Sequence, residues 1–585
     1  MEMDLSNPKF LAAIDMGSNS FKLLIVRAES NRKFLVIDHF KEPVVLGRGM
    51  ISNSSSISPE SITKATLALK KFNQILQKNH IIYQTQIVAT SAVREAVNKS
   101  EFLYKIKEKS GFIDDEIRVL SGVEEARFVY MGILQFLPVY DKTTLAIDIG
   151  GGSTEFVIGK SGKVFFSISS KLGHVSLTDE FVKGEKMIVN MRNYIRSVIY
   201  ESGLVEKVKE IGFDIAVGSS GTIKSIEKAV SLRYGCDLSG SVVPNGGEFS
   251  RDWKFNKEEL VGVVEKLCEG GDDDEEIRRN GFFKRRSEFI LAGAVLLLEI
   301  FEILGIKELE VSEYALGEGV IAETLASCCE DYDIKANARW LSVTKLATRF
   351  NTDKRMKLAS LSVGIAKEMF KGLRKSDELA NHQFLDTVSL DEKDLEYLEA
   401  ACLLHNIGLF IGKKGYHKHS HRIIKNGEQL HGYSTEEVEL IALLARHHRK
   451  KFPKSTQGSL EGFPKELKEK FKVLCAILRI SIAVQHCKLT TFHGLETSNC
   501  QEGFELVFNE KSGQSLPPGE VKLSAENVEA ELKSELNYFQ EFHRARKNHQ
   551  HYVHILRNKY LYCVVLLNFE SLSSEANKQV QNLLY

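Results

Sequence analysis

The sequence predicts an α/β protein in which two similar domains face each other across a cleft, followed by a mainly helical region. The first observation is a glycine-rich loop between two apolar segments that occurs twice, within residues 11–26 and 144–158. Short apolar segments and helical patterns share the chain up to about residue 330, as in α/β proteins. From about residue 335 the pattern becomes helical, with few strand signals before Phe504.

The loop at residues 148–153 is the more distinctive of the two. Residues 145–147 are predicted as a buried strand and residues 156–158 as its return, with Asp148, three glycines and Ser153 between them. Three glycines can place several backbone N–H groups around one concavity and let an anion approach closely. An aspartate at the end of a strand beside such a loop commonly holds a divalent cation. The alternative is a glycine-rich hairpin without a ligand.

The N-terminal copy favours the phosphate-loop interpretation. Superposing Asp15 on Asp148 aligns Gly17 with Gly150, and it aligns Ser20 with Ser153. Two loops in register indicate two related domains that each offer a loop to one cleft.

The remaining elements of the first 330 residues follow in order. Residues 11–40 hold three apolar segments, interpreted as a meander. Apolar residues at helical spacing between Ile62 and Leu76 predict a helix, and Ser121 begins another. Further expected strands are residues 87–89, 117–120, 164–169, 214–217 and 308–312; further expected helices are residues 185–204 and 289–304. Residues 171–174 are expected to finish the second meander, residues 270–276 to form a solvated acidic loop, and residues 316–319 to form a closing turn.

Composition excludes several classes of protein. A chain of 585 residues is too long for one core and predicts three or four domains. Equal numbers of basic and acidic residues, 78 each, give no global field for nucleic acid. Nine cysteines without a CxxC pair fit reduced thiols. The acidic N-terminus resembles no signal peptide, and no run of about 18 apolar residues suggests a membrane span. We therefore expect a cytoplasmic protein without nucleic-acid or membrane partners.

Five sequence blocks, in order, resemble the exopolyphosphatase/guanosine pentaphosphate phosphatase (Ppx/GppA) family. The blocks are residues 15–20, 89–94, 120–127, 148–155 and 218–224. The resemblance implies two actin-like/RNase H-like domains, of the actin-like ATPase superfamily, with the phosphate cleft between them. It also implies a magnesium-dependent phosphohydrolase. The family has Leu-Arg-Glu-Gly where this chain has Gly317, which removes one basic contact.

The resemblance assigns roles to individual residues. Glu125 matches the catalytic glutamate, which would deprotonate water, and Arg94 matches a phosphate-binding arginine. Taken alone, Arg94 could be a surface arginine, and Glu125 could stabilise the helix N-terminus while Glu124 completes a capping box with Ser121. Asp148, Glu155 and Asp15 are the expected metal ligands, for Mg²⁺. Expected substrate-binding residues are Gly17, Ser18, Asn19, Ser20, Gly150, Gly151, Gly152, Ser153, Gly218, Ser219, Ser220, Gly221 and Thr222.

The helical region resembles HD-type phosphohydrolase domains, with departures at two ligand positions. Asn406 follows His405 where a His-Asp doublet is expected, and Met356 stands where a ligand histidine would stand. We therefore expect a degenerate HD-like domain without its metal, whose histidines serve as polar or basic surface.

Two basic clusters lie in the same region. The first comprises Lys413, Lys414, Lys418, Arg422 and Lys425; the second comprises Arg446, Arg449, Lys450, Lys451 and Lys454. One interpretation is a solvated helix face. The other is a surface for a long polyanion, with Lys413, Lys414, Arg449 and Lys450 added to the substrate-binding residues.

The expected domains are residues 1–135, 136–330, 335–500 and 501–585, the last with strands at 504–507 and 561–567 and a helix at about 526–547. The expected activity is removal of the terminal phosphate from inorganic polyphosphate or guanosine pentaphosphate, and the sequence leaves both substrates open. The alternatives are an ATP-dependent kinase or chaperone of the same superfamily, and a non-catalytic protein that senses nucleotide or polyphosphate. The oligomeric state also stays open, with a homodimer as one candidate.

Overall fold

A computed structural model gives the fold of the chain. It describes residues 9–29, 33–46, 55–79, 82–112, 117–181, 187–232, 253–269, 288–329, 332–379, 389–427, 430–449, 460 and 462–486, and four later strands. The chain divides into two compact units, Met1–Ala338 and Arg339–Tyr585, which are treated one at a time below.

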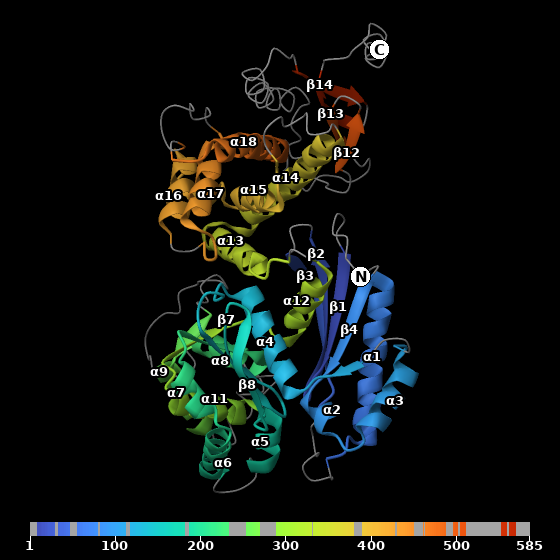
Figure 1. Ribbon diagram of the computed structural model, residues 1–585, viewed down its shortest axis with the longest axis vertical. Helices are drawn as coiled ribbons and strands as arrows, with labels where there is room; N and C mark the ends of the chain where they lie inside the picture. The colour runs from blue at the N-terminus through green and yellow to red at the C-terminus, as the bar shows by residue number, and fades with distance from the viewer. Residues whose placement is uncertain are drawn as a thin grey trace. The chain divides into compact units, whose positions relative to one another are not determined.

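The first unit begins with a five-stranded sheet (Figure 1). Its strands are β1 (Lys9–Met16), β2 (Ser20–Ala28), β3 (Phe34–Pro43), β4 (Ile82–Ala89) and β5 (Ile117–Val119). Their order is β3-β2-β1-β4-β5. The first three strands form the expected antiparallel meander, while β4 pairs parallel to β1 and β5 parallel to β4.

The second sheet repeats this topology. Its strands are β6 (Thr144–Ile149), β7 (Thr154–Lys160), β8 (Lys163–Ser170), β9 (Ile215–Ser219), β10 (Lys254–Asn256) and β11 (Glu308–Val311). Their order is β10-β11-β9-β6-β7-β8, in which β6, β7 and β8 form the meander and β9 and β11 continue it in parallel. The repeat predicted from the two loops is therefore confirmed, together with the α/β class.

Helices cover both sheets and also lie between them. The first sheet packs on α1 (Pro59–Asn79) and α3 (Lys99–Ser110). The second packs on α5 (His174–Phe181), α6 (Met187–Glu201), α7 (Leu204–Ile211), α8 (Ser220–Ser231), α9 (Lys257–Glu269) and α11 (Ile290–Leu304). A central core between the sheets contains α4 (Gly122–Phe136) and α12 (Leu316–Cys328), as Figure 1 shows.

Two glycines allow α4 and α12 to cross in direct backbone contact. A Cβ atom built on Gly132 would lie 1.9 Å from the carbonyl oxygen of Ala315. A Cβ atom on Gly319 would lie 1.8 Å from the carbonyl oxygen of Phe128. Both distances are far below van der Waals contact, so neither position can carry a side chain without moving a helix.

Two sequence predictions in this unit are wrong. Residues 171–174 do not complete the meander, because α5 begins at His174. Residues 316–319 are not a closing turn, because they form the first turn of α12. Glu318 stabilises that turn by accepting a 2.9 Å hydrogen bond from the Ala315 N–H. Buried residues at helical spacing, from Val320 to Leu325, continue the helix into the central core.

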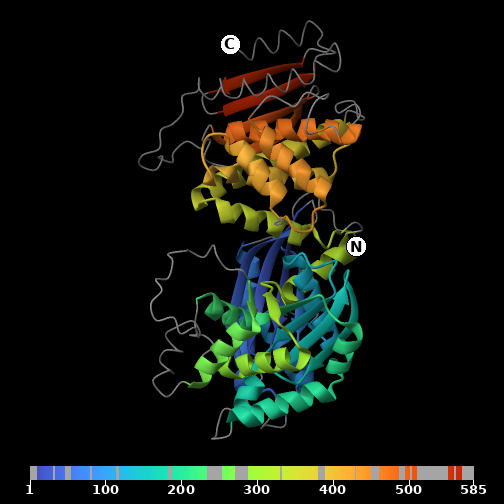
Figure 2. The ribbon, with the colours of Figure 1, turned by 90° about the vertical axis from the view of Figure 1, so that its left-hand side faces the viewer.

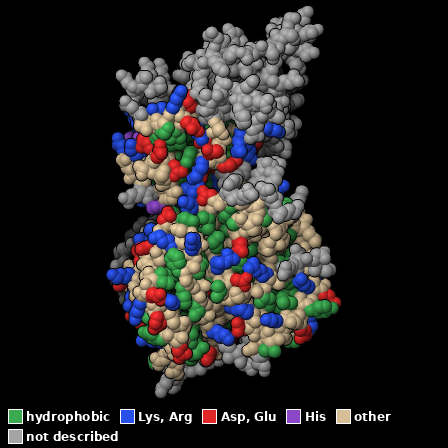
Figure 3. All heavy atoms as spheres, viewed as in Figure 1, with side chains coloured by type: hydrophobic (Ala, Val, Ile, Leu, Met, Phe, Trp, Pro, Cys, Tyr) green, Lys and Arg blue, Asp and Glu red, His purple; other side chains and the backbone are tan. Residues whose placement is uncertain are grey.

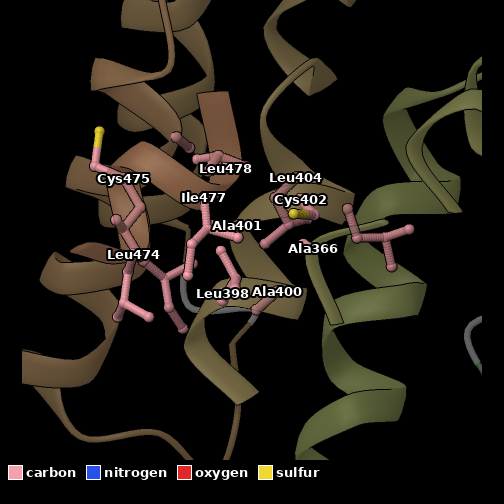
Figure 4. Packing of buried hydrophobic residues seen from close by; sticks show 14 of the residues in the cluster. Ala366, Leu398, Ala400, Ala401, Cys402, Leu404, Leu474, Cys475, Ile477 and Leu478 are labelled. Carbon is pink, nitrogen blue, oxygen red and sulfur yellow. The ribbon is translucent and has the colours of Figure 1, made fainter. Parts of the chain in front are cut away.

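The second unit is mainly helical, as expected. Its helices are α13 (Ala336–Phe350), which begins in the last residues of the first unit, α14 (Asp353–Leu379), α15 (Glu392–Leu404), η2 (Ile407–Phe410), α16 (Tyr416–Asn426), α17 (Thr435–His447) and α18 (Lys465–His486). Small and aliphatic side chains of α15, such as Ala401 and Leu404, interleave with those of α18, such as Leu474 and Leu478 (Figure 4). This core shows why the apolar pattern after residue 335 has helical spacing.

A four-stranded sheet ends the described chain. Its strands are β12 (Leu495–Cys500), β13 (Gly503–Asn509), β14 (His551–Asn558) and β15 (Leu561–Asn568), in the order β12-β13-β15-β14. The sheet packs against the helices of its unit through α14 (Figure 2). The strands predicted at 504–507 and 561–567 are confirmed, whereas β12 and β14 were missed. The predicted helix at 526–547 and the acidic loop at 270–276 lie outside the described residues.

Among the described helices, none is long and apolar enough to cross a bilayer. On the face of the first unit in Figure 3, acidic and basic side chains are interspersed, which agrees with the net charge of zero.

Candidate active site

A cleft in the first unit gathers residues from both sheets. The space between its walls, part of it open to solvent, is about 680 Å³. Of the predicted site residues, those that line it are Asp15, Gly17, Ser18, Asn19, Ser20, Glu125, Asp148, Gly150, Gly151, Ser153, Glu155, Ser220 and Gly221. The loops β1–β2 and β6–β7 therefore meet at one place, as the repeat predicted, and the junction of β9 and α8 lies there as well.

The two hairpin loops have the same local geometry. A Cβ atom on Gly17 would lie 3.0 Å from the carbonyl oxygen of Ser20, and one on Gly150 would lie 3.0 Å from that of Ser153. The loops also contact each other, because a Cβ atom on Gly151 would lie 3.3 Å from the Asn19 backbone nitrogen. Glycine at position 151 therefore favours the close approach of one loop to the other, because a Cβ atom there would push the neighbouring loop outward.

The third loop connects β9 to α8 and holds the carboxylate of Asp148. The Ser219 hydroxyl donates a hydrogen bond to Asp148 Oδ2 across the parallel pair β6–β9. Ser220 has a φ of 87°, a left-handed conformation that is strained for a residue with a side chain. Gly218 does not line the cleft; a Cβ atom there would lie 2.7 Å from Leu309 Cδ2, so this glycine serves packing.

Arg94 and Glu125 form an ion pair at the edge of the cleft. Arg94 lies in the short helix α2 (Ser91–Glu95), which follows β4, and Glu125 lies in the first turn of α4. Arg94 Nη1 donates to Glu125 Oε2 at 2.7 Å and to the Leu120 carbonyl at 3.0 Å. Arg94 is therefore held by the site and is not a free surface arginine.

The adjacent glutamates have opposite environments. Glu124 completes the predicted capping box with Ser121 and accepts a hydrogen bond from Arg118, and these bonds lower its pKa to about 2. Burial raises the pKa of Glu125 to about 7 although Arg94 opposes the shift, and the charges of Asp15 and Asp148 add to the increase. A carboxylate with a pKa near neutral pH is suited to accept a proton from water.

The cleft concentrates negative charge. Burial, followed by repulsion from Glu125 and Asp148, raises the pKa of Glu155 well above its usual range. Glu155 Oε1 accepts hydrogen bonds from Ser153 Oγ at 2.7 Å and Ser169 Oγ at 2.8 Å. Burial also raises the pKa of Asp148. These carboxyl groups fit a divalent cation, whose charge would relieve their repulsion.

The geometry limits how such a cation could be held. Within the described part of the chain, no three His, Cys, Asp or Glu side chains form a cluster that could hold a metal ion. Mg²⁺ normally takes only one or two carboxylates and keeps several waters. Asp15 is already paired with Lys22, whose Nζ lies 2.9 Å from Asp15 Oδ2. Asp148 and Glu155 are therefore the better candidates of the three predicted ligands.

Sequence reasoning missed several residues of the cleft. Lys22, Lys41 and His174 line it. Lys22 could have been found by extending the superposition of the two hairpins along the strands. His174 had no such signal, because it belongs to the helix that was predicted as part of a strand.

The predicted basic residues of the second unit have different surroundings. Lys413 and Lys414 are exposed, and Arg449 lies over the ring of Tyr416. Lys425 pairs with Glu439 at 2.8 Å, so the first cluster is not wholly free of acids. Lys450, Lys451 and Lys454 lie outside the described residues.

The expectation that the histidines of this unit form its surface is wrong for three of them. His405, His417 and His448 are buried. The rings of His405 and His448 meet edge to face, with 5.0 Å between their centroids. Burial lowers the pKa of His448 well below its usual range, so this residue adds no positive charge at neutral pH.

The doublet His405-Asn406 is hydrogen-bonded within the fold. Asn406 Oδ1 accepts from Asn351 Nδ2 at 2.9 Å, and His405 Nδ1 donates to the Cys402 carbonyl at 2.7 Å. The expected loss of a metal at this position stays a prediction.

Comparison with known proteins gives the family. Residues 24–328 match the model of the Ppx/GppA phosphatase family, and residues 338–529 match the model of Ppx/GppA phosphatase domain III. The chain belongs to the Ppx/GppA phosphatase family. The actin-like fold and the family resemblance are thereby confirmed, and membership supports phosphohydrolase activity at the level of the family.

Solved structures include similar proteins. An exopolyphosphatase from Cytophaga hutchinsonii is 26% identical, with a TM-score of 0.47; the match covers 55% of this chain and 98% of that one. The Aquifex aeolicus member of the Ppx/GppA family is also 26% identical, with a TM-score of 0.45, covering 56% of this chain and 100% of that one.

Proposed function

We propose that this member of the Ppx/GppA family is a magnesium-dependent hydrolase that removes the terminal phosphate from inorganic polyphosphate, guanosine pentaphosphate or both. The observation that carries the proposal is the pair Arg94–Glu125, placed beside three small-residue loops. The loops are suited to bind phosphate oxygens through backbone N–H groups. Glu125, with its pKa of about 7, is suited to take a proton from the attacking water.

In this proposal each side chain of the site has a separate role. Arg94 orients the Glu125 carboxylate through the 2.7 Å hydrogen bond and offers further N–H groups to the phosphate being transferred. Glu125 then orients a water molecule and accepts its proton as the water oxygen bonds to the terminal phosphorus. The bond from that phosphorus to the bridging oxygen breaks, and the shortened substrate leaves with the bridging oxygen as a phosphate anion. Asp148 and Glu155 would hold Mg²⁺, which supplies positive charge against the phosphate oxygens.

Two cationic side chains support a substrate with several phosphates. Lys22 and Lys41 line the same cleft as the loops. Their positive charge favours a polyanion in the cleft, although Lys22 also pairs with Asp15. This charge does not distinguish a polyphosphate chain from the 5′-triphosphate of guanosine pentaphosphate.

The test is phosphate release by the purified protein from polyphosphate and from guanosine pentaphosphate, with Mg²⁺ and with excess EDTA. ATP with a sugar acceptor serves as the substrate for the kinase alternative. Release that requires Mg²⁺ and Glu125 would support the proposal. Binding of either compound without turnover would instead support the second candidate, a non-catalytic protein that senses nucleotide or polyphosphate.

A further inference from the structure

His174 joins the loops of the two sheets. It is the first residue of α5, it is buried, and no resemblance assigned it a role. Its Nε2 lies 3.3 Å from Asn19 Nδ2 in the β1–β2 loop. Its Nδ1 lies 3.3 Å from Thr222 Oγ1 in the first turn of α8. Its backbone N–H donates to the Gly150 carbonyl of the β6–β7 loop at 3.1 Å.

The chemistry of the partners determines the direction of these bonds. An amide Nδ2 can only donate, so the Nε2 atom of His174 must accept from Asn19. A neutral imidazole that accepts at Nε2 carries its proton at Nδ1, which then donates to the Thr222 hydroxyl. The His174 ring therefore links Asn19 in one domain to Thr222 in the other. Its Nε2 atom accepts one hydrogen bond and its Nδ1 atom donates the other.

The surroundings fix both ends of this link. The Asn19 carbonyl accepts from the backbone N–H groups of Val44 and Val45, at 3.3 and 2.9 Å. On the other side, a Cβ atom on Gly293 of α11 would lie 2.4 Å from Thr222 Cγ2, so α11 packs directly behind Thr222. The His174 ring also packs against Phe289, with 5.8 Å between the ring centroids.

We infer that His174 is a positioning residue. It holds Asn19 and the β1–β2 loop at a fixed distance from the other two loops, at which all three loops can contact one phosphoryl group. The expected effect on the reaction rate rests on the proposed function. The hydrogen-bonded link from Asn19 through His174 to Thr222 can be tested without measuring turnover. Misplacing a reacting group by about 1 Å can cost on the order of 100-fold in rate. The loss should appear mainly in kcat, because the loops can still bind phosphate when their spacing is wrong.

The chain allows matched variants. In His174→Gln, the side-chain amide oxygen can take the place of Nε2 and accept from Asn19. In His174→Asn, the amide N–H can take the place of Nδ1 and donate to Thr222, but the hydrogen bond from Asn19 is broken. His174→Phe removes both bonds and keeps a ring beside Phe289. His39→Gln, on the exposed side of β3, is the control.

We expect kcat to fall by about 10- to 100-fold in His174→Phe and His174→Asn, and to stay within a few-fold of wild type in His174→Gln and His39→Gln. Adding His174→Phe to Asn19→Ala should cost little more than Asn19→Ala alone, since the ring acts through that amide. Equal losses in His174→Gln and His174→Asn, or full additivity with Asn19→Ala, would overturn the inference.

Hydrogen exchange provides a readout that needs no activity. A peptide covering residues 17–24 should exchange faster in His174→Phe and His174→Asn than in the wild type and His174→Gln. A peptide from α1, residues 62–76, should be unchanged. Unchanged exchange at residues 17–24 in His174→Phe would contradict the link. Absence of phosphate release by the wild-type protein would contradict only the proposed function.

Discussion

Lys22 and Glu155 occupy the same position in the two repeated hairpins, with opposite charge. Lys22 pairs with Asp15 in the β1–β2 register, and Glu155 pairs with Asp148 in the β6–β7 register. The first hairpin therefore presents a neutralised aspartate and the second presents two carboxyl groups. The repeat is symmetric in its backbone and asymmetric in its charge, so the second hairpin is the one to which we assign the proposed metal.

This asymmetry predicts unequal effects of two matched substitutions. Asp148→Asn should raise the Mg²⁺ concentration for half-maximal activity by at least about tenfold, because it removes one of the two proposed ligands. Asp15→Asn should raise it much less, since Asp15 is occupied by Lys22. Titration of phosphate release with Mg²⁺ measures both, and Glu206→Gln, on the exposed side of α7, is the control. Equal shifts in the two aspartate variants would be inconsistent with the asymmetry.

Glu125→Gln should lose about 10² to 10⁴ in kcat, because an amide cannot accept the proton from water. The substrate KM should change little, since the loops remain in place. The neighbouring variant Glu124→Gln is the matched control, because Glu124 belongs to the capping box and not to the cleft. Steady-state kinetics on both variants tests the assignment, and turnover within a few-fold of wild type in Glu125→Gln would remove this glutamate from the chemistry.

The pKa of Glu125, about 7, predicts how activity depends on pH. The base must be ionised, so kcat/KM should fall about tenfold per pH unit below that value. Arg94 lowers this pKa, so Arg94→Met should move the acid limb of the profile to higher pH. A profile that keeps its acid limb in Arg94→Met would show that another group controls it.

The raised pKa of Glu125 also predicts how the stability of the protein depends on pH. Folding raises this carboxyl pKa from its usual 4.5, so the folded state favours the protonated form. Protonation of Glu125 therefore contributes to the free energy of unfolding. This contribution is fully present below pH 4.5 and is lost as the pH rises through 7. Glu125→Gln, which cannot ionise, should therefore unfold at a higher temperature than the wild type at pH 8, with a smaller difference at pH 5. Thermal melts at both pH values measure this difference.

The basic residues of the second unit lead to a prediction about substrate length. Neutralising Lys413, Lys414, Lys450 and Lys451 together should weaken binding of long polyphosphate and leave guanosine pentaphosphate nearly unchanged. For each lysine–phosphate pair that is removed, the slope of log affinity against log salt should fall by about one or less. Apparent affinities at two salt concentrations test this, and equal losses for both substrates would mean that the lysines act on folding or on the cleft.

Much of the first unit could be predicted because its signals are local. The loops 15–20 and 148–153 and the capping box at Ser121 are patterns of adjacent residues, and each was found where the structure has it. The helix start at His174 was missed because its N–H is held by the Gly150 carbonyl, far along the chain. The first turn of α12 was missed although its signal is local, since Glu318 caps it by accepting from the Ala315 N–H. The burial of His405, His417 and His448 was missed because a polar residue type does not reveal that it is enclosed by packed helices.

The crossing of α4 and α12 also predicts a measurable change. Gly132→Ala should reduce the free energy of unfolding by about 1–3 kcal/mol, because the new Cβ atom would overlap the Ala315 carbonyl. Gly364→Ala, in α14, is the matched control, since its Cβ atom would have no neighbour within 4 Å and alanine favours a helix. Chemical denaturation measures both variants, and similar stabilities for the two would show that the helices adjust freely.

That crossing has a mechanical consequence. At Gly132 and Gly319 the backbones of α4 and of the start of α12 touch directly, with no side chain between them to absorb a displacement. Arg127 of α4 also pairs with Glu323 of α12 along the same crossing. Neither helix can slide along the other without lifting over a carbonyl group. We therefore expect the two helices to move as one rigid body about their crossing point. The loops of the two domains can then separate and close while the helix ends rotate together.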